Sequence, residues 1–326
     1  MLIPPKYTLT KKMVASLQTI EANREVINSV SIPIEIEENI RRTSTLRSSL
    51  FSARVEGNTL TLDELGDHPS NNQKKSEIWN ILKALGWLKK RERKDMTIGD
   101  LLELHKITMK NIHPDAGRLR SEFSATFNSA GIAIYMHPPH EIMPRLKRLI
   151  KFSNSDKESL IPIKACLVHY TFEKIHPFLD GNGRIGRLLL QKTLMHGGYG
   201  MKGLMALEEF IDEHRSEYYR ALEEPDKDST DYLLFMLEAI AIKSTEAKEL
   251  VLQKNELTVE DYLLPRRGEI LKIIKDHKLI NFDSIKRRFD KVNERTLRYD
   301  LKSLQDQGLV RKRGSTKGVY YEPITN

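Results

Sequence analysis

Apolar residues recur every three or four positions through most of this 326-residue chain, which is the spacing of one face of an α-helix. Charged and polar residues stand between them and would cover the solvent side of each helix. The pattern predicts long helices within residues 10–60 and further helices at about 97–110, 144–152, 207–222 and 232–257. The helix at 97–110 has a good starting residue in Thr97 or Asp100. We therefore predict a mainly α-helical protein.

The helical period gives way to a period of two after Arg120. The alternating apolar residues are Phe123, Ala125 and Phe127 on one side of a turn-forming segment and Ile132, Ile134 and Met136 on the other. The segment between them, 128–131, contains Asn, Ser and Gly, which are typical turn residues. We predict a β-hairpin over residues 123–136.

The last sixty residues follow a different plan. Helices are predicted at 265–276, 283–289 and 293–307, followed by two short strands between Val310 and Tyr321. This order resembles a winged helix-turn-helix. The basic residues that the third helix and the wing would expose are Arg295, Arg298, Lys302, Arg311, Lys312, Arg313 and Lys317. The resemblance implies a module that places its third helix in the major groove of DNA, or one that docks on another protein.

The distribution of charge favours an anionic partner for this C-terminal segment. Residues 264–326 contain sixteen Lys and Arg against eight Asp and Glu, which accounts for the whole net charge of +8. The length suggests two or three domains. A single cysteine, Cys166, excludes a disulfide framework within the chain, and no apolar run reaches the length of a membrane span. We expect a cytoplasmic protein without membrane partners.

The segment richest in chemical groups lies between two apolar runs, so it is predicted to form the loop of a helix–loop–helix. It reads His176-Pro177-Phe178-Leu179-Asp180-Gly181-Asn182-Gly183-Arg184-Ile185-Gly186-Arg187. Its glycines allow successive backbone N–H groups to converge on an anion, which also meets the positive end of the following helix. The two arginines, three positions apart, can each bind phosphate oxygens with two N–H groups.

Two further residues turn this anion site into a predicted phosphate-transfer site. A carboxylate among phosphate-binding groups, Asp180, is expected to hold a divalent cation such as Mg²⁺. His176 is the one group of the segment that can act as a base near neutral pH.

The segment matches the Fic-family pattern H-P-F-x-[D/E]-G-N-G-R-x-x-R at every defined position, so the chain resembles Fic (Fido) proteins. The resemblance implies a helical catalytic core that transfers AMP from ATP to a hydroxyl side chain of a target protein. It implies that His176 deprotonates the hydroxyl and that Asp180 holds Mg²⁺ on the α- and β-phosphates.

The resemblance also assigns the other residues of the loop. Asn182 and the backbone amides of the glycines, with Gly181, Gly183 and Gly186 counted among the nucleotide-binding residues, would cradle the phosphates. Arg184 would contact the phosphate tail, Arg187 would clamp the γ-phosphate, and Phe178 would anchor the loop in the core. Both glycines of the Gly-Asn-Gly-Arg stretch are present, which favours nucleotidyl over phosphoryl transfer.

A second motif lies upstream. Gly57 is a natural helix stop, which puts Glu56 at a helix C-terminus, where the helix dipole disfavours a carboxylate. Such a conflict can mark a functional residue or simply a solvated side chain in a capping turn. Ser52 through Gly57 matches the pattern [S/T]-x-x-x-E-[G/N] of Fic proteins with an inhibitory helix. The resemblance implies that Glu56 pairs with Arg187 and so excludes the γ-phosphate or misplaces the α-phosphate.

The resemblance implies partners as well. The 123–136 hairpin would be a flap that pairs with an extended target segment presenting a Tyr, Thr or Ser hydroxyl. The helical stretch at 207–222 would close over the nucleotide base, with Tyr218 or Tyr219 stacking on the purine and at least one of them packing in the core. His214 stands where family members often carry Asn, which departs from the family pattern.

We divide the chain into an N-terminal helical region with the inhibitory helix (1–95), a Fic core (96–225), a linking helix (226–263) and a winged-helix domain (264–326). Two alternatives to AMP transfer remain open at this point. One is a DNA-binding transcriptional regulator whose Fic core senses nucleotide. The other is a Fic enzyme that removes AMP, with Glu56 orienting water. A homodimer is compatible with each.

Overall fold

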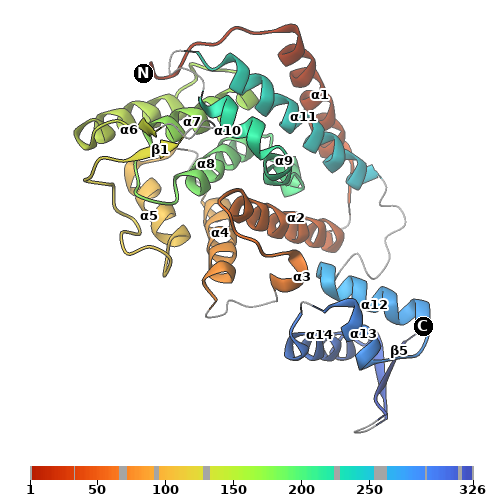
Figure 1. Cartoon of the computed structure of the whole chain (residues 1–326). Helices are drawn as coiled ribbons and strands as arrows, with labels where there is room; N and C mark the ends of the chain where they lie inside the picture. The colour runs from red at the N-terminus through yellow and green to blue at the C-terminus, as the bar shows by residue number, and fades with distance from the viewer. Residues whose placement is uncertain are drawn as a thin grey trace. The chain divides into compact units, whose positions relative to one another are not determined.

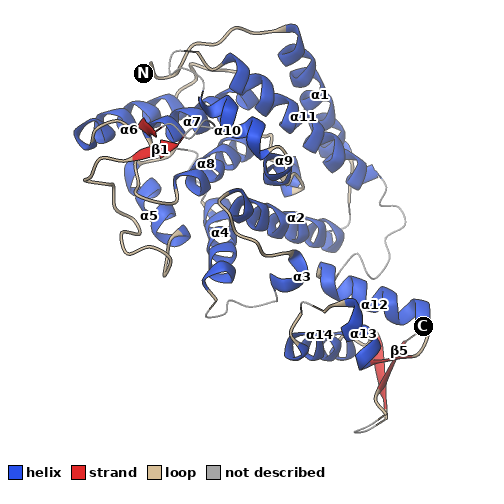
Figure 2. Ribbon diagram, in the orientation of Figure 1, coloured by secondary structure: helices blue, strands red, loops and turns tan. Residues whose placement is uncertain are grey.

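The computed structural model describes residues 2–32, 34–65, 72–91, 95–127, 133–223, 228–252, 263–290, 292–314 and 318–324 (Figure 1). Helices dominate these residues, as predicted, and the described strands form two small sheets (Figure 2). The chain divides into two compact units. The first comprises Met1–Ser31, Ser44–Thr59 and Ser70–Gln253, and the second comprises Ile32–Thr43, Leu60–Pro69 and Lys254–Asn326.

The first unit is a set of helices packed around a buried one. They are α1 (Lys11–Ser29), the later part of α2 (Ile34–Val55), α4 (Gln73–Lys90), α5 (Ile98–Thr108), α6 (Pro139–Ser153), α7 (Ile161–Ile175), α8 (Asn182–His196), η1 (Met201–Gly203), α9 (Leu207–Glu213), α10 (Arg215–Glu223) and α11 (Thr230–Leu252). Helix α7 packs against α6, α8 and α11, and twelve of its fifteen residues are buried. A helix that is apolar nearly all round belongs in the interior, and α7 is the centre of this core.

Three helix ends differ from the sequence prediction or make it more specific. Thr97 and Asp100 act together at the start of α5, because the side chain of each accepts the backbone N–H of the other. Helix α6 begins at Pro139, earlier than the predicted Pro144. Proline is favoured in the first turn of a helix, because the N–H that it lacks would have no partner there. The predicted helix at 207–222 is two helices, broken at His214.

The helix predicted at 232–257 corresponds to α11, and its residues 253–257 lie outside the described residues. Although this segment was expected to link two domains, α11 packs along α1 and α7 within the first unit (Figure 1). None of the described helices is long and apolar enough to cross a membrane.

The predicted hairpin is confirmed by strands β1 (Ala125–Phe127) and β2 (Ala133–Tyr135), which pair antiparallel. The register joins Ala125 to Tyr135 and Phe127 to Ala133. The predicted turn at 128–131, together with Ile132, lies outside the described residues.

The second unit contains the winged helix-turn-helix predicted from the sequence. Its elements are α3 (Leu62–Leu65), α12 (Pro265–His277), β3 (Ile280–Asn281), α13 (Phe282–Arg288), α14 (Glu294–Asp306), β4 (Val310–Arg313) and β5 (Tyr320–Pro323). The strands form an antiparallel sheet in the order β3-β5-β4. Strand β3 was missed because two residues are too few to show a period, and its place is set by pairing with β5.

Candidate active site

The predicted helix–loop–helix is present, with the loop running from the end of α7 to the start of α8 (Figure 1). Two left-handed residues turn the chain at its ends: His176, with φ 49°, and Gly181, with φ 84°. At Gly181 a side chain would be strained and would also approach the Met109 sulfur to 2.7 Å, so only glycine fits. The first backbone N–H groups of α8 have no partner within the helix, so an anion would be expected to bind at this helix start.

Asn182 holds this loop in shape with its own side chain. Its Oδ1 accepts the backbone N–H of Phe178 and its Nδ2 donates to the Phe178 carbonyl, both at 2.9 Å. Phe178 is fully buried, as predicted for the anchor of the loop. The side-chain amide of Asn182 thus closes the loop, and its expected contact with phosphate stays a prediction.

His105, on helix α5, packs against the loop and was not identified from the sequence. Its ring stacks on Phe178 with centroids 3.7 Å apart. Its Nδ1 accepts the backbone N–H of Gly117 at 2.8 Å, so the proton resides on Nε2, which donates to the Asp180 carbonyl at 3.0 Å. Burial lowers the pKa of His105 to about 4, which keeps the ring neutral in this role. No local pattern distinguishes this histidine from any other polar residue of helix α5.

His176 has the geometry of a base. Its Nδ1 donates to the Glu173 carbonyl at 3.3 Å, which leaves the lone pair on Nε2. Burial lowers the pKa of His176, and the positive charge of Arg120 lowers it further, while the Glu173 hydrogen bond acts in the other direction. The imidazole is therefore neutral at neutral pH and able to accept a proton.

Asp180 and Arg184 lie together at the mouth of the site. Arg184 is buried and donates to Oδ1 of Asp180 at 2.6 Å and to Oε1 of Glu77 at 2.5 Å. The Asp180 side chain is 47% exposed. Among the described residues there is no group of three or more His, Cys, Asp or Glu that could hold a metal ion, so a metal at Asp180 would have this one carboxylate as its acidic ligand. One carboxylate suits Mg²⁺, which usually takes its other ligands from substrate phosphates and water.

Arg187 is the most buried cation of the site, with 1% of its surface exposed. It donates from Nε to the Ser52 hydroxyl at 3.0 Å and from Nη2 to the Ser52 carbonyl at 2.8 Å and to Oε1 of Glu56 at 2.9 Å. Burial, the largest influence, acts to lower the pKa of Arg187, but Glu56 together with Tyr218, Tyr219 and Glu173 acts in the other direction, and the pKa is raised. The pairing of Glu56 with Arg187 expected from the sequence is therefore present.

The Glu56 carboxylate lies over the first turn of α8. A side chain added at Gly183 would overlap Oε1 of Glu56 and come within 3.1 Å of Nη1 of Arg187. That Nη1 is buried and has no hydrogen-bond partner. Helix α2 ends at Val55, and Gly57 has φ 97°, as the predicted helix stop requires. Glu56 thus occupies the place where the helix terminus and Arg187 would together bind an anion.

Gly186 was predicted to contact the nucleotide, but it faces α7. A side chain there would overlap the carboxyl of Glu173, so this glycine permits the close packing of α7 and α8. Glu173 was not identified from the sequence. Burial raises its pKa to about 8, although the nearby Arg187 acts to lower it. Its buried Oε1 has no hydrogen-bond partner.

The two tyrosines of α10 have different environments. Tyr218 is 1% exposed, and its hydroxyl lies 3.1 Å from Nε2 of His169. Tyr219 is 37% exposed, and its hydroxyl donates to the Val55 carbonyl at 3.2 Å. The structure therefore places Tyr218 in the core, and Tyr219 is the more exposed ring of the two.

Polar contacts hold the end of α2 on α9. Arg47 pairs with Glu209, the Ser48 hydroxyl donates to Glu208 at 2.7 Å, and Arg54 pairs with Asp212 at 3.0 Å. These contacts fix the segment that carries Ser52 and Glu56.

The basic residues predicted on the winged helix are exposed. On α14 these are Arg295, Arg298 and Lys302, and on β4 they are Arg311, Lys312 and Arg313, whereas Lys317 lies outside the described residues. Arg298 is 59% exposed and lies over the Phe282 ring, with its guanidinium carbon 4.0 Å from the ring centroid. Arg311 and Arg313 pair with Glu322 on the neighbouring strand.

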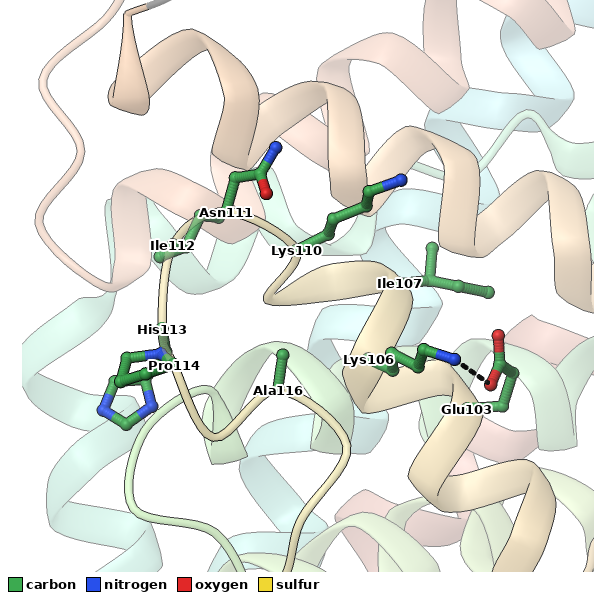
Figure 3. A pocket seen from close by; sticks show the side chains of 9 residues that line it. All are labelled: Glu103, Lys106, Ile107, Lys110, Asn111, Ile112, His113, Pro114 and Ala116. Carbon is green, nitrogen blue, oxygen red and sulfur yellow. Dashed lines mark ion pairs between the residues drawn. The ribbon is translucent and has the colours of Figure 1, made fainter.

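A separate open hollow of about 780 Å³ lies at the end of α5 (Figure 3). It is lined by Glu103, Lys106, Ile107, Lys110, Asn111, Ile112, His113, Pro114 and Ala116. Glu103 and Lys106 pair with each other across 3.6 Å. None of the predicted site residues lines this hollow.

Two family matches fall on the regions described above. Residues 95–194 match the Fic/DOC family, and residues 268–322 match the ribonuclease R winged-helix domain. The chain is 27% identical over 196 residues to the protein adenylyltransferase Fic of Drosophila yakuba, which is 56% of this chain and 39% of that protein. It is 28% identical over 205 residues to the protein of the same name from Drosophila willistoni, covering 59% and 40%. The chain thus spans about two fifths of the length of these curated relatives.

Solved structures show the same fold. A Fic family protein from Desulfovibrio desulfuricans superposes with a TM-score of 0.67 at 22% identity, over 99% of this chain and 98% of that one. Fic-1 of Caenorhabditis elegans (residues 134–508) superposes with a TM-score of 0.60 at 25% identity, over 74% of this chain and 72% of that one.

Proposed function

The chain carries a Fic/DOC family domain, and we propose that it is a protein adenylyltransferase that moves AMP from ATP to a Tyr, Thr or Ser hydroxyl of a target protein. The observation that supports this most directly is the neutral His176, with Nε2 available, placed beside the anion site formed by the start of α8 and Arg187. The names of the relatives support the same class of reaction, since they are protein adenylyltransferases.

These positions support the following reaction. His176 Nε2 accepts the proton of the target hydroxyl, and the hydroxyl oxygen attacks the α-phosphorus of ATP. A bond forms between that oxygen and phosphorus, the bond to the β-phosphate oxygen breaks, and pyrophosphate leaves. Mg²⁺ held at Asp180 would neutralise charge on the phosphates. The backbone N–H groups of α8, with Arg184 and Arg187, bind the phosphate oxygens.

We also propose that Glu56 restrains this reaction. In the structure its carboxylate accepts a hydrogen bond from Arg187 Nη2 and lies over Gly183, where a phosphate would bind. One guanidinium cannot make the same contact to a carboxylate and to a phosphate at once, so ATP must displace Glu56 or bind with its phosphates shifted.

The flap offers a strand edge on which a target segment can bind. A two-stranded sheet leaves one edge of each strand unpaired, so β1 or β2 can accept a third, extended strand from the target by main-chain hydrogen bonds. This supports a target that presents its hydroxyl in an extended segment.

Labelled ATP separates the candidate reactions. Protein that acquires label from [α-³²P]ATP and none from [γ-³²P]ATP, with equimolar pyrophosphate released, is the expected result. Label from the γ position would instead indicate a kinase. Loss of AMP from previously labelled protein, dependent on Glu56, would favour the AMP-removing alternative. Nucleotide binding with no label transferred would favour a nucleotide-sensing regulator.

We propose a second activity for the winged-helix domain, which is binding to duplex nucleic acid. The supporting observation is the row of exposed cations on α14, Arg295, Arg298 and Lys302, on the helix that such modules place in the major groove. Docking on an acidic protein surface is the competing use of the same charge. Gel-shift or anisotropy measurements with the full chain at low salt test the proposal.

A further inference from the structure

The Arg120 side chain joins three separate parts of the active site. It is 4% exposed, and its guanidinium donates to three backbone carbonyls. The bonds run from Nε to the His176 carbonyl at 2.7 Å, from Nη1 to the Glu122 carbonyl at 2.9 Å and from Nη2 to the His137 carbonyl at 2.5 Å. The backbone N–H of Arg120 also donates to the Pro177 carbonyl at 3.0 Å.

The three acceptor carbonyls belong to the two stems of the flap and to the start of the catalytic loop. Glu122 precedes strand β1 and His137 follows strand β2, so the two carbonyls belong to the two stems of the flap. The stems are also joined to each other, because the Met136 N–H donates to the Ser124 carbonyl at 2.9 Å. The third acceptor is the carbonyl of His176, the proposed base. One guanidinium therefore connects both ends of the flap to the start of the catalytic loop.

The choice of arginine has a physical reason. The planar guanidinium holds its N–H groups in fixed directions, so three bonds define the relative positions of three segments, which a flexible ammonium group cannot do. Burial lowers the pKa of Arg120, and its bonds go to carbonyls that do not neutralise its charge. That charge acts on His176, whose pKa it lowers. A geometric role and an electrostatic role thus belong to the same side chain.

We propose that Arg120 is a positioning residue that holds the flap in register with His176, so that a target strand added to the flap brings its hydroxyl to Nε2. The inference rests on the proposed function and extends it to a residue outside the His176–Arg187 segment. Within the site, the other charged and titratable groups that face His176 are Glu56, Asp180 and Arg120 itself, and the Glu173 carbonyl fixes its ring.

The test compares Arg120→Lys, Arg120→Gln and a control, Arg118→Lys, each in a Glu56→Gly background. Arg118 is an exposed arginine two residues away on the same segment. Labelling of lysate proteins from [α-³²P]ATP should fall about 10- to 100-fold in both Arg120 variants, because small misplacements of reacting groups cost this much. Mg·ATP affinity, measured calorimetrically, should stay within about twofold because Arg120 is assigned no contact with nucleotide.

Two readouts separate positioning from general stability. Hydrogen exchange at the Met136 amide should accelerate in Arg120→Lys and remain unchanged in Arg118→Lys. The acid limb of the labelling profile should move to higher pH in Arg120→Gln, since removing the positive charge raises the pKa of His176, and should move less in Arg120→Lys, which keeps the charge.

The outcomes are distinct for the inference and for the proposed function. Unchanged flap exchange and unchanged labelling in Arg120→Lys would overturn the inference. Labelling that survives His176→Ala in the same background would overturn the proposed function, and the hydrogen-exchange result would still decide whether Arg120 anchors the flap.

Discussion

The candidate active site and the winged helix both carry arginines, but those of the active site are buried and those on α14 of the winged helix are exposed. Arg184 and Arg187 are buried and already bonded to carboxylates of Glu77, Asp180 and Glu56. Arg298 is exposed and paired only loosely with Glu294 at 3.7 Å. An anion that approaches the buried arginines meets a carboxylate on each of them, whereas an anion that approaches α14 meets exposed cations that are surrounded mainly by water and salt ions.

This difference indicates how anion binding can be regulated at each of the two sites. A buried guanidinium has few partners and depends strongly on each, which is the basis for proposing that the contact with Glu56 controls the availability of Arg187. An exposed one has screened, additive interactions, so its affinity responds to ionic strength and to the number of charges.

The largest expected effect tests whether the buried region performs chemistry as well as binding. His176→Ala should lower labelling from [α-³²P]ATP by roughly 10²–10⁴-fold, because a general base is removed. Mg·ATP affinity by calorimetry should change by no more than a few-fold, since the imidazole is proposed to act on the target hydroxyl. His140→Ala, at an exposed histidine, is the control. Full labelling in His176→Ala would contradict the catalytic assignment.

The next effect sharpens the claim that one carboxylate controls the buried cation. Glu56→Gly removes the competitor of the phosphate and leaves His176 and Asp180 in place. Labelling should rise about ten- to hundredfold, with tighter Mg·ATP binding, because a hydrogen bond to a charged group is worth on the order of 1.5–3 kcal/mol. Arg187→Ala should show no such gain, since the phosphate clamp is lost with the restraint. A fall in labelling in Glu56→Gly would instead indicate that Glu56 serves AMP removal.

A smaller effect is expected at the exposed arginines of the winged helix. Arg298→Glu in the full chain should weaken binding to duplex DNA about three- to tenfold at low salt and reduce the slope of log affinity against log salt by about one, as for one lost phosphate contact. Lys272→Glu, the same charge change at an exposed position of α12, should have less effect. Absence of any DNA complex in the unaltered chain would favour protein docking.

A further, still smaller effect concerns what holds Glu56 in place. Asp212→Asn breaks the pair with Arg54 at the end of α2, and labelling should rise about two- to threefold, because this partly exposed pair is worth less than about 1 kcal/mol. Exchanging the charges, with Arg54→Asp and Asp212→Arg together, should return labelling toward the starting level. No difference among these variants would place the restraint in Ser52 and Glu56 alone.

The smallest effect is a pH dependence of stability. The pKa of Glu173 is about 8 in the folded protein against an ordinary value of 4.5, so the folded state favours the protonated form. Its contribution to stability is complete below about pH 4.5 and is lost as the pH rises toward 8. Glu173→Gln should therefore lose less thermal stability than the unaltered chain between pH 6 and 8.5, by a few degrees in Tm. Glu103→Gln, at an exposed glutamate, should follow the unaltered chain.

Local pattern was sufficient for the elements and for the chemistry that is contiguous in the chain. The helix–loop–helix around residues 176–187, the hairpin and the order of the winged helix follow from hydrophobic period and turn residues, which act over a few positions. The contact of Glu56 with Arg187 was expected only through resemblance, because nothing in the intervening 130 residues specifies that these two side chains meet.

Tertiary structure alone decided which side chains support the loop and which are accessible. His105, Arg120 and Glu173 reach the site from α5, the flap stem and α7, and only packing brings them to their partners. Packing likewise buries Tyr218 and leaves Tyr219 accessible, although the two are adjacent in the sequence. The physical reason is that burial and hydrogen-bond partnership depend on what surrounds a side chain in space, whereas periodicity records only which face of its own element it occupies.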